Sequence, residues 1–411
     1  MNTHQTAQPP PYTSNAQTVQ HRYPISDKSG KQWGMLTFAS GARSTNSIPR
    51  FYEDDIIHGI VDVDKIDSIR TVTIKVAGSV ITGPMADERT TFWKYSTCLW
   101  TRKTAPADVG NRVCSFSIPI PTEVCLKGNP ETFRLPETFL ERHTRVTVLY
   151  ELSVTLSRGM FRPDIYFQTR FRYMPCTRPS APSPLRQRAY RLGEPLRGPR
   201  HDPAGWKTTP TVMAHGYVFR TRSAVVHCAL SLARPLSYTR GSVIPCWITL
   251  ASEDPEALEF FATPDAMVLH LRRCVRSRNL SPMALNDVDE SFTTVGLASW
   301  WARPEYDSNE FTRTLEGELS VPADLVSSSA LSMFSISYTV ELSAPNSLGF
   351  TPLDGNALIT VPVVVATMHA ADAPRPVVYA PPSYDTFTPH DESSPTVLRE
   401  VYPHVSRSGR A

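Results

Sequence analysis

The stretch that decides the fold is Val146-Thr147-Val148-Leu149-Tyr150-Glu151-Leu152-Ser153-Val154-Thr155-Leu156. Every even position from Val146 to Leu156 is apolar, whereas most odd positions are polar. Side chains of a β-strand point alternately to its two faces, so a period of two is typical of a strand with one buried face. The stretch therefore predicts a long strand in a protein that is mostly β.

Similar short alternating runs occur in two blocks, with turn residues between them. The first block contains Ile60–Val63, Val72–Val76, Phe116–Pro119 and Ile165–Tyr173, and the second contains Val226–Leu232, Ile244–Leu250, Met267–Val275, Leu315–Val321, Phe334–Leu342 and Leu358–Val365. Helical periodicity is almost absent, apart from a short helix predicted where Asp254 precedes Pro255. Many short strands of this kind favour an all-β chain built from two β-sandwich domains in tandem.

Proline marks the boundaries of these blocks. The chain has 37 Pro in 411 residues, and many of them lie at the two ends and between the blocks. Pro-rich polar segments bury too little apolar surface to offset the entropy of ordering. We therefore expect a disordered tail over 1–20, a sandwich over 21–175, a Pro/Arg-rich linker over 176–214, a second sandwich over 215–368, and a disordered tail over 369–411.

The two blocks also resemble each other. Each has a strand that ends in Pro, at Pro119 and at Pro322, and later a strand centred on a tyrosine, Tyr150 or Tyr338. The spacing differs between the blocks. The pattern is nevertheless what two copies of one sandwich would leave in a sequence.

Composition argues against several classes of function. A net charge of +3 is too small to indicate a nucleic-acid-binding protein. The seven Cys are scattered singly, with no metal-binding spacing, and are expected to be reduced; no cofactor or metal is predicted. The motifs of hydrolases, metalloproteases, nucleotide-binding and dinucleotide-binding enzymes are missing, so we expect no enzymatic activity. No apolar run is long enough to span a membrane, and the N-terminus does not resemble a signal peptide, which disfavours an extracellular adhesion protein.

Several motifs resemble those of the arrestin family, in particular the α-arrestins of fungi. Gly59–Val63 followed by Val72–Gly78 resembles the opening strands of an arrestin N-terminal domain. Leu135-Pro136-Glu137-Thr138-Phe139 resembles the family's Leu-Pro-Pro-Ser-Phe, with Glu137 in place of the second proline. Pro235–Pro245 resembles the start of an arrestin C-terminal domain. The resemblance covers roughly residues 50–368 and implies two immunoglobulin-like, arrestin-type sandwiches.

The resemblance also implies a function. α-Arrestins are non-enzymatic adaptors that bind the cytoplasmic tails of membrane transporters or receptors and recruit HECT-type ubiquitin ligases through PPxY motifs. The corresponding expectation is a cytoplasmic protein recruited to the plasma membrane or endosomes for endocytosis of cargo. The alternative is an arrestin-fold scaffold or coat subunit, of the retromer or pH-signalling kind, that does not use its tails.

Two PPxY motifs support the first reading independently of the resemblance. Adjacent prolines pre-set the polyproline II shape, which docks in the aromatic groove of a WW domain, while the tyrosine enters a separate pocket. Pro381, Pro382 and Tyr384 form one motif, and Pro9, Pro10 and Tyr12 form the other. Two matches, both outside the alternating blocks, exceed what composition predicts, although Pro-rich tails raise the chance level. The alternative is that both motifs belong to Pro-rich spacers without a binding role.

The expected linker contains two further candidates. Pro179-Ser180-Ala181-Pro182 matches the peptide recognised by the membrane-sorting ESCRT-I complex, and its alternative is an ordinary linker. A basic strip is a candidate contact for anionic lipid at a membrane surface or for a phosphorylated cargo tail, although such runs are commonly just solvated. Its members are Arg186, Arg188, Arg191, Arg197 and Arg200.

Overall fold

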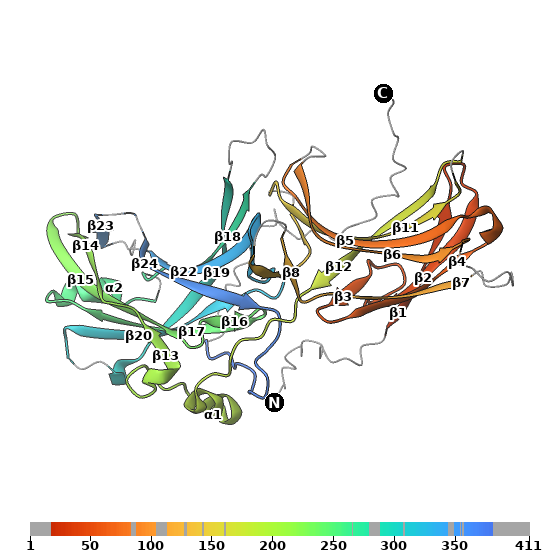
Figure 1. Ribbon diagram of the computed structural model, residues 1–411. Helices are drawn as coiled ribbons and strands as arrows, with labels where there is room; N and C mark the ends of the chain where they lie inside the picture. Colours follow the sequence, from red (N-terminus) through yellow and green to blue (C-terminus); the bar gives the residue numbers. More distant parts are fainter. Residues whose placement is uncertain are drawn as a thin grey trace.

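The computed structural model describes residues 18–83, 88–103, 113–126, 130–141, 144–159, 162–264, 266–278, 288–306, 309–343, 349–353, 355 and 357–380. The chain is mostly β and has two β-sheet regions, as the sequence predicted; the first covers roughly 19–174 and the second roughly 203–366, so the second begins before the predicted residue 215. The two regions lie side by side (Figure 1). Within the described residues, no helix is long and apolar enough to cross a membrane.

The N-terminal region consists mainly of two sheets. One has the order β1-β2-β4-β7 and the other has the order β3-β12-β11-β5-β6, with β10 added to β11. Their bounds are β1 (Val19–Ser26), β2 (Gln32–Ser40), β3 (Arg50–Tyr52), β4 (Ile56–Val63), β5 (Thr71–Ile81), β6 (Arg89–Thr101), β7 (Val113–Pro119), β10 (Phe139–Leu140), β11 (Thr147–Ser157) and β12 (Ile165–Met174). A small hairpin, β8 (Glu123–Cys125) and β9 (Thr132–Arg134), and a 3-10 turn, η1 (Ile66–Ser68), complete the region.

Aromatic rings join the two sheets of this region. Tyr23 of β1 lies against Phe167 of β12, with ring centroids 5.6 Å apart. Phe38 of β2 lies 6.2 Å from Phe51 of β3. The apolar faces of the sheets therefore share one core, which is the arrangement that alternating strands require.

The strand β11 departs from the expectation of one buried face. Glu151 and Ser153, on its polar face, are also buried. Arg89 bonds to Glu151, and Arg170 lies 3.7 Å from the same carboxylate. Buried charges require such partners. The apolar/polar alternation correctly identified β11 as a strand. Its second face is nevertheless largely buried, because the polar side chains there pack against one another.

The C-terminal region is one continuous ladder that bends back on itself. The strand order is β16-β24-β22-β18-β19-β20-β17-β15-β14-β23, with β13 added to β15 and β21 to β22. The bounds are β13 (Trp206–Thr208), β14 (Val212–Val218), β15 (Arg222–Ala233), β16 (Ser237–Thr239), β17 (Ser242–Ala251), β18 (Leu269–Arg278), β19 (Val288–Ala302), β20 (Thr312–Val321), β21 (Ser329–Leu331), β22 (Phe334–Ser343), β23 (Phe350–Pro352) and β24 (Ala357–Ala366). The long strand β19 makes the bend, because its first part pairs with β18 and its last part with β20.

The predicted short helix is confirmed as α2 (Pro255–Phe261). The side chain of Asp254 caps it by accepting hydrogen bonds from the amides of Glu256 and Ala257. Phe261 is fully buried, and its ring centroid lies 4.6 Å from that of Phe350. The helix thus fills the core at the far end of the C-terminal region.

The two tyrosines of the sequence repeat have the same role in the two regions. The buried hydroxyl of Tyr150 on β11 donates to the carbonyl of Pro136, at 2.6 Å. The hydroxyl of Tyr338 on β22 donates to the carbonyl of Val326, at 2.5 Å. Each tyrosine therefore fixes a loop that precedes its own strand by a similar number of residues. This correspondence supports the repeat suggested by the sequence.

The seven cysteines are all free thiols, and their accessibility differs widely. Cys98 and Cys125 are exposed, whereas Cys228 and Cys246 are fully buried in the C-terminal core. Burial raises the pKa of Cys228 to about 12 and raises the pKa of Cys246 well above its ordinary value.

Alkylation with iodoacetamide at pH 8 should therefore label Cys98 and Cys125 first, because the thiolate is the reactive form. Cys228 and Cys246 should be labelled only after urea unfolds the chain. Site-resolved mass spectrometry measures this order. Labelling of Cys246 in the native chain as fast as that of Cys98 would contradict the described core.

Candidate partner-binding surface

An extended segment of the N-terminal region, Leu135–Glu141, packs against the C-terminal region. Its backbone is held by the N-terminal region, because Tyr150 donates to Pro136 and the hydroxyl of Thr138 accepts from the amide of Tyr173, at 2.8 Å. Successive side chains of an extended segment point to opposite sides. Glu137, Phe139 and Glu141 consequently all reach the C-terminal region.

Glu137 makes the most buried of these contacts. Its carboxylate accepts from Arg240 at 3.0 and 3.2 Å, and from both the amide and the hydroxyl of Ser327 at 3.0 Å. The side chains of Glu137 and Arg240 are only about one tenth exposed. Arg240 also donates to the carbonyl of Leu325, at 2.8 Å. Both charges are thus paired, which is the condition under which buried charges are tolerated.

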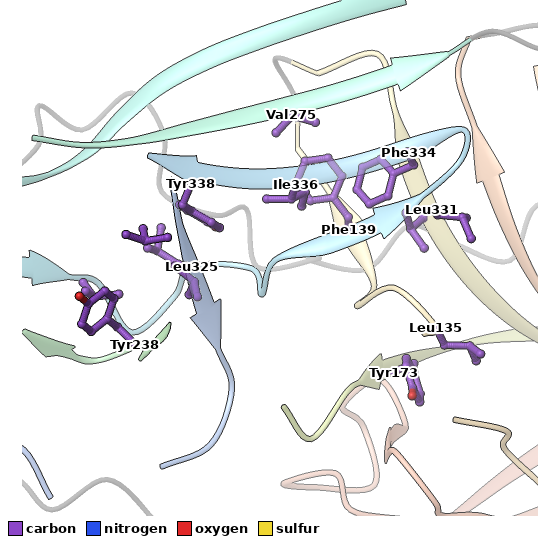
Figure 2. Close-up of a cluster of buried hydrophobic side chains, with 14 of the residues drawn as sticks. Leu135, Phe139, Tyr173, Tyr238, Val275, Leu325, Leu331, Phe334, Ile336 and Tyr338 are labelled. Carbon is purple, nitrogen blue, oxygen red and sulfur yellow. The ribbon is translucent and has the colours of Figure 1, made fainter. Parts of the chain in front are cut away.

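Phe139 and Glu141 extend the contact on either side of this ion pair. The ring of Phe139 lies 5.5 Å from that of Phe334, within a cluster that includes Leu135, Leu331 and Ile336 (Figure 2). Glu141 forms a two-bond ion pair with Arg273 of β18, at 2.6 and 2.8 Å. The junction therefore combines an apolar contact with two charge-assisted contacts, and it fixes the regions relative to each other.

Glu137→Ala should lower the free energy of unfolding by about 3 kcal/mol, because Arg240 would keep a buried charge without its carboxylate partner. Urea unfolding of the full chain measures the loss. The matched control is Glu290→Ala, which removes the exposed partner of Arg276 and should cost less than about 1 kcal/mol. Equal effects of the two substitutions would contradict a buried ionic junction.

The predicted Pro/Arg-rich linker, residues 176–214, contains a helix, a 3-10 turn and the start of the second β-sheet region. Ser183 caps α1 (Pro184–Leu192), Pro184 occupies its first turn, and Gly193 ends it in the left-handed conformation. The turn η3 (Pro203–Gly205) follows, and β13 then joins the sheet. Pro184, Gly193 and Pro203 of this segment are therefore end residues of short elements.

This segment forms an outer layer over the sheet at β17 and β20, together with η4 (Pro304–Tyr306). The ring centroid of Trp206 lies 6.2 Å from that of Trp247 on β17, and the ring centroid of Tyr306 lies 4.8 Å from that of Trp247. Gly198 also contacts the Trp247 ring, so closely that a Cβ atom there would lie 2.9 Å from it. Helix α1 lies outside the sheets in Figure 1.

Arg186 holds the outer layer in place and is not part of an exposed basic strip. It is 4% exposed, stacks on the Trp206 ring at 4.8 Å, and donates to the carbonyls of Arg234 and Gly205. The Trp206 ring face and the two carbonyls take the place of the water that would otherwise solvate the guanidinium. The prediction that Arg186 contacts lipid or cargo is therefore wrong. Arg188, Arg191, Arg197 and Arg200 are exposed, as the prediction required, although Arg188 is paired with Glu194.

Arg186→Ala should destabilise the chain by about 3 kcal/mol, since two charge-assisted hydrogen bonds and a cation–π contact are lost. The segment 188–200 should then be cut by trypsin much faster than in the wild type. Urea unfolding and timed proteolysis measure the two effects. Arg191→Ala, at an exposed position of the same helix, serves as the control, with a change within about 0.5 kcal/mol. An unchanged cleavage rate in Arg186→Ala would contradict this role.

The chain after β24 is also packed against the outer layer up to Ala380, so the expected disordered tail does not begin at 369. Thr367 and Thr177 bond to each other through backbone and hydroxyl groups, at 3.0 and 3.1 Å. Further along, Val377 and Tyr379 pack against Ala189, Tyr190 and Leu196. We call residues 369–380 the strap.

The strap ends on a buried carboxylate. Glu318 of β20 is 4% exposed and accepts from the amide of Tyr379, at 2.9 and 3.0 Å, and from the amide of Ala380, at 2.9 Å. Burial raises the pKa of Glu318, and the two amide hydrogen bonds oppose that rise. Burial likewise raises the pKa of Tyr190 to about 12. Glu318 occupies a polar position of the alternating run of β20, as Glu316 does, so nothing in the sequence singled it out or indicated its partner.

The remaining predicted site residues divide into two groups. Pro381, Pro382 and Tyr384, and likewise Pro9, Pro10 and Tyr12, lie outside the described residues. Pro179 and Pro182 are half-buried and line a small cavity of ≈ 60 Å³ together with His369 and Pro376 of the strap. The strap therefore lies beside part of the candidate ESCRT-I peptide, whose Ser180 and Ala181 are exposed.

No protein-family model matches this chain, and a search of curated proteins also gave no match. Among the described residues, no group of three His, Cys, Asp or Glu side chains is arranged to hold a metal ion. The partner-binding features are therefore assigned from the residues and contacts alone.

Proposed function

We propose that the chain is an arrestin-like, non-enzymatic adaptor that joins a WW-domain ubiquitin ligase of the HECT type to membrane cargo. In this proposal the two β-sheet regions are arrestin-type, immunoglobulin-like sandwiches. The paired roles of Tyr150 and Tyr338 support a duplicated unit. The segment Leu135–Phe139, which carries part of the sequence resemblance, supports it as well, because it forms the junction of the two regions.

The observation that carries the proposal is the position of Ala380, whose amide is bonded to Glu318. Ala380 is the last described residue, and Pro381-Pro382-Ser383-Tyr384 follows it directly in the sequence. The motif is thus attached to the body of the protein without any spacer. A ligase bound there would be held next to the C-terminal region and whatever cargo that region binds.

In the cell, the adaptor would act on the cytoplasmic side of the plasma membrane or of endosomes. The cargo would be cytoplasmic tails of transporters or receptors, and the ligase would ubiquitinate them for endocytosis. The exposed arginines Arg188, Arg191, Arg197 and Arg200 are the proposed basic contact, because they lie on the outer layer beside the strap. Anionic lipid and phosphorylated tails both offer the charge that such residues bind.

The proposal predicts that immobilised WW domains retain the full chain through its two motifs. Tyr384→Ala should weaken binding about tenfold or more, because the tyrosine pocket is left empty. Tyr384→Ala with Tyr12→Ala should abolish it. Tyr402→Ala is the matched control, since this tail tyrosine is not preceded by two prolines. Retention of the double variant at the wild-type level would refute the ligase-adaptor role.

The alternative is a scaffold or coat subunit of the same fold that does not use its tails. A chain lacking residues 1–17 and 381–411 keeps the strap and all described contacts. If that chain supports cargo uptake in cells as well as the full chain does, the scaffold is the better description.

A further inference from the structure

We propose that the strap is a reversible clamp that masks the Pro381–Tyr384 motif, so that a WW domain binds fully only after Glu318 releases Tyr379 and Ala380. This inference rests on the proposed use of the motif as a WW ligand. It concerns the regulation of that motif and commits to one occupant of the Glu318 site, the chain's own residues 377–380.

The first support is the environment of Glu318. Its side chain lies on the outer face of β20, two residues from Glu316, and both are almost fully buried. Glu316 is paired with Arg303 and accepts from Trp301, at 3.2 Å. Within the described part of the chain, Glu318 has no such ion pair, and the hydrogen bonds found for it come from the strap amides. A buried carboxylate is costly without donors, so the strap meets a need that the sheet itself leaves open.

The second support is that the side chains fix the register of the strap. Val377 and Tyr379 point into the apolar cluster with Ala189, Tyr190 and Leu196, while Val378 between them is 62% exposed. Alternation of this kind is what an extended segment shows when one face is bound. The amide contacts and the side-chain contacts therefore specify one position, which places Ala380 at Glu318.

The third support is the distance along the chain between the clamp and the motif. The amide of Ala380 is bonded to Glu318 at 2.9 Å, and Pro381 is the next residue. Consecutive Cα atoms are only about 3.8 Å apart. A WW domain packs aromatic side chains around both prolines. A folded domain in that position must therefore displace the residues beside Pro381 from the surface formed by β20 and α1.

The contacts of the clamp are few, which makes it reversible. They amount to two backbone amides on one carboxylate and two partly buried side chains. A motif that is accessible in one tenth of the molecules binds about tenfold more weakly than the free peptide, because the apparent Kd is divided by the accessible fraction. We therefore expect the peptide 376–390 to bind a WW domain several-fold to tenfold more tightly than the full chain.

The test measures the affinity for a WW domain by titration in the Tyr12→Ala background, so that only the Pro381–Tyr384 motif contributes to binding. Glu318→Gln keeps the shape of the side chain but removes its charge and replaces one acceptor oxygen with an NH₂ group, which weakens the contact with the strap amides. It should therefore move the affinity toward that of the peptide. Glu316→Gln is the matched control, because it is a buried carboxylate on the same face without a strap contact, and it should bind like the Tyr12→Ala parent. Val377→Ser supplies a second release variant, so the conclusion does not depend on the folding of Glu318→Gln.

Hydrogen exchange at Tyr379 and Ala380 reads the clamp directly. Both amides should exchange slowly in the parent chain, and quickly in Glu318→Gln or when a WW domain is bound. If the peptide and the parent chain bind equally well, or if both release variants leave the affinity unchanged, the clamp is refuted while the proposed function stands. If the peptide itself fails to bind, the proposed function is refuted, and the clamp has nothing to mask.

Discussion

The position of the two β-sheet regions relative to each other depends on one buried carboxylate. Glu137, on the N-terminal region, accepts hydrogen bonds from Arg240 and Ser327 of the C-terminal region. Removing a carboxylate from water costs several kcal/mol, and only complete pairing offsets that cost. The pairing is specific in geometry, because three donors must converge on two oxygens. Phe139 adds apolar contact beside it, and Glu141 adds a second ion pair. Such a junction favours one relative position of the regions over a range of positions.

Buried carboxylates that need hydrogen-bond donors occur also on the outer face of β20, where the donors come from two different sources. Glu316 and Glu318 are two residues apart, and desolvation raises the pKa of both. Glu316 is satisfied by Arg303, which is a permanent neighbour in the sheet region. Glu318 is satisfied by backbone amides of a segment that follows the last strand. The first solution is fixed by the fold, whereas the second lasts only while the strap stays in place.

Sequence patterns predicted the features that depend on local periodicity. The alternation at Val146–Leu156 identified β11, and Asp254-Pro255 identified the start of α2, because the period of two and the N-cap are properties of neighbouring residues. The ordered linker was not predicted. Pro184 and Gly193 begin and end a helix that is held by contacts distant in sequence, with Arg186 on the Trp206 ring and Tyr190 against Val377 and Tyr379. Arg186 was misassigned for the same reason, since its burial depends on where Trp206 lies. Glu137 appeared as a departure from a family motif, and its role required the position of Arg240.

The connection between the two regions crosses the chain at Thr177 and Thr367, between β24 and the strap, and this crossing restricts what release of the strap can do. The amide of each threonine donates to the hydroxyl of the other, and Met368 donates to the carbonyl of Thr177, at 2.9 Å. Thr367 is buried, so this crossing is protected from water. Loss of the Glu318 contact would therefore free the strap from its outer end, at Tyr379 and Ala380, while its inner end stays attached. The Glu137 junction shares no residue with the Glu318 contact. Release of the strap would thus leave the two β-sheet regions in place, because the crossing confines the change to residues beyond Met368.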